Sequence, residues 1–81
     1  MKTKIGVKIL PREVLLDSQG RAVEQTLRLN QMPKAQVRVG KYVELSFDLP
    51  PQEALIEAKV IAQKVLINPL IENFLLEEIK S

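Results

Sequence analysis

The chain lacks histidine, cysteine and tryptophan, and only three of its 81 residues are aromatic. Without histidine and cysteine it has no imidazole base, no thiolate nucleophile, no Ser-His-Asp triad and no His/Cys zinc site. The absence of cysteine excludes disulfides, so nothing indicates an oxidising compartment. The sequence therefore argues against catalysis carried out by this chain alone.

Long apolar runs are also absent. No strictly apolar run exceeds three residues, whereas a membrane-spanning helix needs about 20. The N-terminal segment Met1–Lys4 contains two lysines but is not followed by the apolar stretch of a secretory signal. We therefore expect a cytoplasmic protein that makes no membrane contact.

The length and composition predict one small folded domain over residues 1–81. The chain is 46% hydrophobic and 27% charged, which is ordinary for a globular domain. A chain of this size buries only roughly 63% of the surface that its unfolded form exposes. Because no disulfide or zinc site supplements so small a core, we expect association with other chains.

Charge is distributed unevenly along the chain. Residues 1–41 contain nine Lys or Arg and three Asp or Glu, and residues 42–81 contain three and seven, giving net charges of +6 and −4. Such polarity can steer a nucleic acid or a partner protein. Because the basic residues are spread out, we favour complementary charges within a complex, or solvated faces without a role.

Near the N-terminus, Ile5, Val7 and Ile9 alternate with other residues and predict a half-buried strand that ends before Pro11. A helix then starts over residues 17–20, where Asp17 can cap its first amides, and continues over residues 21–30. Gly20 in its first turn indicates either close approach of another backbone or simply a loose turn.

A second helix begins at Pro51 and is stopped by Asn68-Pro69. Its broad apolar stripe comprises Ala54, Leu55, Ala58, Ile61, Ala62, Val65 and Leu66. The small alanines of this stripe allow close packing of the helix on a sheet. The final strand is expected over residues 70–79, with Phe74 and Leu76 on one face.

The segment 37–49 has the most informative pattern, because its odd positions are apolar except for Lys41. Gly40-Lys41 suits a two-residue hairpin turn. A continuous strand, bent or bulged at Gly40, keeps the apolar residues on one face and is the interpretation we favour. Its roughly 43 Å would overhang a domain about 30 Å across. An overhanging strand predicts pairing with another chain.

A search for sites of chemistry finds little. Glu77 and Glu78 point to opposite faces of a strand, so they are no acid–base pair. The Val39-Gly40-Lys41 stretch lacks the glycines and hydroxyl of a phosphate-binding loop. Arg38 and Lys41 suit an anion or an acidic partner, or form a solvated strand edge. The few aromatics do not resemble the base-stacking set of an RNA-recognition domain.

Three stretches together resemble one family. Leu16-Asp17-Ser18-Gln19-Gly20-Arg21-Ala22-Val23 resembles an L-D-P-Q-G-x-A-V segment. Val37-Arg38-Val39-Gly40-Lys41-Tyr42-Val43-Glu44-Leu45 resembles V-R-x-G-K-x-[IV]-E-L. Leu66-Ile67-Asn68-Pro69-Leu70-Ile71-Glu72-Asn73-Phe74 resembles L-[AL]-N-P-[VL]-I-E-[DN]-[YF]. In this order and spacing they are similar to the PurS family, the small subunit of phosphoribosylformylglycinamidine synthase.

This resemblance implies an α+β fold related to the ferredoxin-like one. It is a small β-α-β-α-β two-layer sandwich, whose three-stranded sheet has one long central strand and two helices on one face. The resemblance also implies a non-catalytic subunit of an ATP-dependent ligase in purine biosynthesis. Such a subunit joins the glutaminase PurQ and the synthetase PurL, supports ammonia transfer, and forms a homodimer or tetramer.

The same resemblance implies no cofactor or metal in this chain, with ATP and Mg²⁺ in the synthetase partner. The residues that we expect to carry partner contacts or structure are Asp17, Gln19, Gly20, Arg38, Gly40, Lys41, Asn68 and Pro69. Helix caps and turns also explain Asp17, Gly20, Asn68 and Pro69 without a partner. The alternative functions are a small regulatory ligand-binding module and an RNA-binding module.

Overall fold

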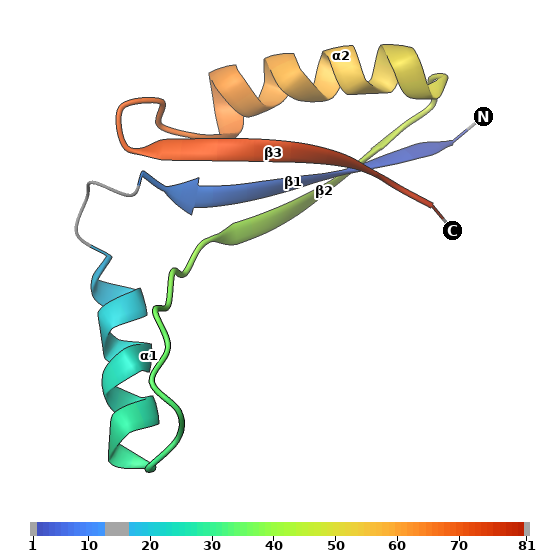
Figure 1. Cartoon of the computed structure of the whole chain (residues 1–81). Helices are drawn as coiled ribbons and strands as arrows, with labels where there is room; N and C mark the ends of the chain where they lie inside the picture. Colours follow the sequence, from blue (N-terminus) through green and yellow to red (C-terminus); the bar gives the residue numbers. More distant parts are fainter. Residues whose placement is uncertain (1, 13–16, 81) are drawn as a thin grey trace.

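The structure, a computed structural model, describes residues 2–12 and 17–80 of the chain. Its elements in chain order are β1 (Thr3–Pro11), α1 (Ser18–Leu29), β2 (Lys41–Phe47), α2 (Pro51–Ile61), the π-helical turn η1 (Ala62–Leu66) and β3 (Glu72–Ile79). Figure 1 shows their arrangement. The predicted β-α-β-α-β order and the α+β class are confirmed. Leu16, the first residue of the first motif, lies outside the described residues.

The three strands form one antiparallel sheet in the order β2-β1-β3. Val7 of β1 lies opposite Val43 of β2 and Leu76 of β3. Ile5, Val7 and Ile9 are at most 1% exposed, so β1 supplies the centre of the core. The long segment 37–49, expected as the central strand, instead provides an edge strand. Within this segment only β2 is hydrogen-bonded to β1, and the pairing starts at Lys41, which lies opposite Ile9.

One face of the sheet is covered by α2. Ala54, Ala58 and Ala62 lie one helical turn apart and are fully buried against the inward side chains of β1. Their small size brings the helix close to the sheet, as the sequence predicts. Ile5, Val7 and Ile9 lie on the face of β1 that the helix covers, which accounts for their alternation in the sequence.

The end of this helix differs from the prediction. In η1, the backbone N–H of Ile67 donates to the carbonyl of Ala62 over 3.1 Å, five residues back. The wider turn shifts the phase of the apolar stripe. Val65, expected on that stripe, is consequently 74% exposed.

The first helix, α1, stands away from the sheet and does not share its face with α2 (Figure 1). Within α1 only Gly20 is buried. The prediction that both helices cover one face of the sheet is therefore wrong, because only α2 does so. The physical reason is that α1 carries few apolar residues and makes its hydrogen bonds to segment 37–39 instead of to the sheet.

We call α1 together with the extended chain up to Gly40 the arm, residues 17–40. Along segment 37–49 the odd positions are half-buried except for Lys41, and the even positions are exposed. The chain passes Gly40 without a hairpin, but the strand itself covers only Lys41–Phe47, so the predicted continuous strand over residues 37–49 is confirmed only for that part. The arm extends the molecule to 48 Å along its longest axis, with a radius of gyration of 15.8 Å. A compact chain of this length has about 12 Å.

No helix in the part of the chain that the structure describes is both long and apolar enough to cross a membrane.

Ala58→Leu tests the close packing of α2 on β1. Because the Ala58 side chain is fully buried, a larger side chain must push the helix off the sheet. We expect the free energy of unfolding in urea to fall by about 1–3 kcal/mol. Lys59→Leu, on the exposed side of the same turn, is the matched control and should change it by less than about 0.5 kcal/mol. Equal effects of the two changes would contradict the packing.

Candidate functional site at the elbow

The three motif segments meet where the arm joins the sheet, and we call this junction the elbow. A groove in it, the elbow groove, is lined by residues from all three segments, including Asp17, Gln19, Gly40, Lys41 and Glu72. The fold thus brings together stretches that lie up to 55 positions apart in the chain. It does so because the ends of β1, β2 and β3 that adjoin the arm lie at one end of the sheet (Figure 1).

Asp17 joins the two parts of the arm. One carboxylate oxygen accepts from the N–H of Gly20 and the other from the N–H of Val39, both over 2.9 Å. The first bond is the predicted N-cap. The second, to a residue 22 positions away, was not predicted. These two amide donors, Gly20 first, hold the pKa of Asp17 below its ordinary value.

Gly20 is required by close approach of another backbone, one of the two alternatives that the sequence left open. A Cβ atom placed there would lie 2.3 Å from the carbonyl oxygen of Val37 and 2.5 Å from the Asp17 carboxylate. No side chain fits at those distances. Gln19, one residue earlier, is exposed and lines the elbow groove.

Glu24 provides a second link within the arm that the sequence analysis missed. Its carboxylate accepts from the N–H of Val37 and from the guanidinium of Arg21, each over 2.7 Å. Arg21 also donates to the carbonyl of Val37 over 3.1 Å. The Val37 amide is the main cause that lowers the pKa of Glu24. The signal in the sequence is only the i, i+3 spacing of Arg21 and Glu24, which is typical of a solvated face.

Gly40 and Lys41 carry the chain from the arm into β2. A Cβ atom on Gly40 would lie 2.0 Å from the carbonyl oxygen of Ile9, so the close contact with β1 needs glycine. The ammonium of Lys41 lies 3.6 Å from a carboxylate oxygen of Glu72 at the start of β3. Because the Lys41 side chain is 60% exposed, this pair contributes little stability by itself.

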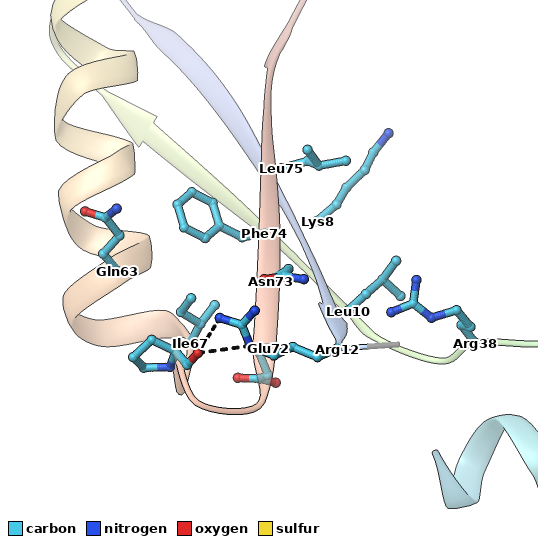
Figure 2. A pocket seen from close by; sticks show the side chains of 11 residues that line it. Lys8, Leu10, Arg12, Arg38, Gln63, Ile67, Glu72, Asn73, Phe74 and Leu75 are labelled. Atoms are coloured by element: carbon cyan, nitrogen blue, oxygen red, sulfur yellow. Dashed lines mark hydrogen bonds between the residues drawn. The ribbon is translucent and has the colours of Figure 1, made fainter. Parts of the chain in front are cut away.

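Arg38 reaches back to the sheet. Its guanidinium donates to the carbonyl of Pro11, the last residue of β1. The side chain also lines a second groove, the edge groove, together with Lys8, Arg12 and Phe74 (Figure 2). Arg38 therefore belongs to the elbow but borders a different groove from Lys41.

The third motif forms a tightly bonded turn. The side-chain oxygen of Asn68 accepts from the N–H of Leu70 over 3.1 Å, and its carbonyl accepts from Ile71 and Glu72. The Glu72 carboxylate accepts in return from the N–H of Asn68 over 2.9 Å. These bonds fix the turn that precedes β3, which explains why an Asn-Pro pair occurs at this point.

Arg12, which the sequence analysis did not single out, ties this turn to the end of β1. Its Nη2 and Nε atoms donate to the carbonyl of Pro69 over 2.6 and 3.2 Å (Figure 2). The N–H of Arg12 donates to the carbonyl of Ile71 over 2.9 Å. No sequence signal points to this role, because it depends on the distance between segments 57 positions apart.

The two acidic side chains that hold the arm at the elbow are both engaged with the backbone. The carboxylates of Asp17 and Glu24 both accept backbone hydrogen bonds. Within residues 2–12 and 17–80, no group of three or more acidic side chains is placed to hold a metal ion. The remaining exposed features are cations, grooves and apolar side chains, which are the features of a binding surface.

Comparison with known proteins gives one consistent family. Residues 4–79 match the PurS family model, described as phosphoribosylformylglycinamidine (FGAM) synthase. The chain is 33% identical over 72 residues to the Bacillus subtilis phosphoribosylformylglycinamidine synthase subunit PurS, covering 88% of this chain and 86% of that protein.

Two solved structures place the fold. Thermus thermophilus PurS is similar with a TM-score of 0.84 and 33% identity, covering 99% of this chain and all of that one. A chain in the structure of PurLQS from Thermotoga maritima has a TM-score of 0.89 and 23% identity, covering 98% of this chain and 99% of that one. The second likeness concerns the fold alone.

The arm should open in acid before the sheet unfolds. Asp17 and Glu24 have lowered pKa values in the folded chain, so their contribution to stability is present above their unfolded pKa values, about 4. It is lost as the pH falls through the lower folded values. In an NMR titration, the amide signals of Val37 and Val39 should shift toward unbonded values below about pH 4, while those of β1 hold.

Glu24→Gln is the control for this titration. It removes the titrating group at Val37 and leaves Asp17 beside Val39, so the Val37 signal should lose the part of its acid transition that Glu24 causes, while the Val39 signal keeps its own. If the arm and β1 instead unfold together at one pH in both proteins, the arm is not a separately held unit.

Proposed function

The chain belongs to the PurS family of phosphoribosylformylglycinamidine synthase, and from this membership we propose that it is the non-catalytic small subunit of that ligase in de novo purine biosynthesis. It joins a glutaminase, PurQ, to a synthetase, PurL, so that the complex assembles and ammonia passes between them. ATP and Mg²⁺ act in the synthetase partner. The complex works in the cytoplasm.

The observation that carries this proposal is the elbow itself. The residues of the motifs hold the segments of the elbow together. Asp17 and Glu24 hold backbone amides, and Gly20 and Gly40 permit close approach of backbones. A subunit that works by joining other chains needs such a shaped and rigid surface, and it needs no nucleophile or base of its own.

The named partners are supported by the Thermotoga maritima structure, whose name joins PurL, PurQ and PurS in one assembly. We propose the same two partners for this chain. Their active sites supply the groups that glutamine hydrolysis and amide activation require.

Self-association into a dimer or tetramer is part of the same proposal. The face of the sheet away from α2 exposes Tyr42, which lies over Gly6, and Leu75, which is 69% exposed. Lys8 and Glu77 form a pair over 3.4 Å on this face. Mixed apolar and charged side chains of this kind suit an isologous contact between two copies.

Reconstitution of the synthase tests the function. Purified PurL and PurQ are assayed for glutamine-dependent amidine formation with and without this chain. We expect activity to require the chain, and activity with ammonium salts in place of glutamine to depend on it much less, because PurL then needs no ammonia delivery. Full glutamine-dependent activity from the two larger subunits alone would contradict the proposal.

A further inference from the structure

We propose that the turn 68–71 is a rigid anchor whose Leu70 side chain inserts into an apolar pocket, edged by carboxylates, on a partner subunit of the synthase. This inference rests on the proposed function and deepens it, because it names the contacting residue and the chemistry of the surface that receives it. The turn is exposed at its tip, held by several hydrogen bonds and bordered by cations.

Leu70 is the most exposed large hydrophobic residue of those recorded in the described chain, at 81%. Ile71 beside it is 46% exposed. A leucine that protrudes from the tip of a turn gains nothing from its own fold. Burying its side chain in a partner is worth about 1.5–3 kcal/mol in transfer free energy.

The turn beneath Leu70 is held in place on several sides. Asn68 bonds to the amides of three following residues, and Glu72 closes the loop back onto Asn68. Arg12 clamps the carbonyl of Pro69 with two N–H groups. A side chain presented on a preorganised backbone loses little conformational entropy when it binds, which favours its use as an anchor.

The position of the turn also favours an interface. Pro69 borders the edge groove and Ile71 borders the elbow groove, so the turn that carries Leu70 lies between the two grooves. A partner that receives Leu70 can place flanking side chains on both sides of the tip. An anchor surrounded by such contacts is sheltered from water, as binding hot spots are.

Charge identifies the partner surface. The edge groove is lined by the cations Lys8, Arg12 and Arg38 and by one carboxylate, Glu72. Lys8 is paired with Glu77, whereas Arg12 and Arg38 donate to backbone carbonyls, which carry no net charge. These cations would repel a basic partner surface, and a neutral surface would offer them no complementary charge. The groove therefore favours carboxylates around the pocket that takes Leu70.

The experiment measures binding of the full-length chain to purified PurL and PurQ, separately and mixed, by calorimetry. Leu70→Ser removes the apolar side chain and leaves the turn bonds, which come from the backbone at that position. We expect its Kd for the partner to rise by about tenfold or more. Leu29→Ser is the matched control: it is 75% exposed but lies at the far end of α1, and it should change Kd by less than about twofold.

Arg12→Lys gives a second, independent test. It keeps the positive charge but loses the two-pronged bond to Pro69, so Leu70 is presented on a looser turn. We expect a smaller rise in Kd of about threefold to tenfold, with the melting temperature showing that the sheet stays folded.

The outcomes separate this inference from the proposed function. If the wild-type chain binds and Leu70→Ser binds within twofold of it, the anchor is wrong and the function stands. If the wild-type chain binds neither subunit nor their mixture, both proposals are wrong. A selective loss for Leu70→Ser over Leu29→Ser supports the anchor.

Discussion

The two hydrogen bonds of the Asp17 carboxylate hold the start of α1 against the extended chain that leads into β2. One oxygen caps the helix at Gly20 and the other holds the amide of Val39. The arm has almost no buried apolar core, because only Gly20 of α1 is buried. Its shape therefore depends on these polar links and on the Glu24 link beside them, more than on the hydrophobic effect that holds α2 to the sheet.

This division of the molecule has a functional consequence. The sheet and α2 form a small conventional core, and the arm projects from one end of it, with the elbow at the junction (Figure 1). The motifs that mark the PurS family lie mainly at the elbow, where they set backbone contacts. The hydrogen bonds and close backbone contacts there fix how the motif segments lie relative to one another, which suits the joining role proposed for this chain. The turn 68–71 adds an exposed apolar tip to the elbow.

The sequence predicted those interactions whose two partners lie close together along the chain, and it missed those between distant segments. The cap at Asp17 was predictable because its partner is three residues away. The passage of segment 37–49 through Gly40 without a hairpin was predictable because alternation is a local pattern. The roles of Glu24 and Arg12 depend on which segments meet in space, and no local pattern shows that. The exposure of Val65 was missed because the widened η1 turn breaks the helical period that the stripe assumes.

Residue-resolved hydrogen exchange on Asp17→Ala tests this dependence most directly. The change removes the acceptor for Gly20 and Val39 while leaving the buried residues of β1 and α2 in place. We predict that amide protection falls in α1 and at Val39 and remains in β1 and α2. Unchanged protection of the arm, or an equal loss throughout the chain, would contradict the account that the Asp17 carboxylate, with the Glu24 link beside it, holds the arm as a separate unit.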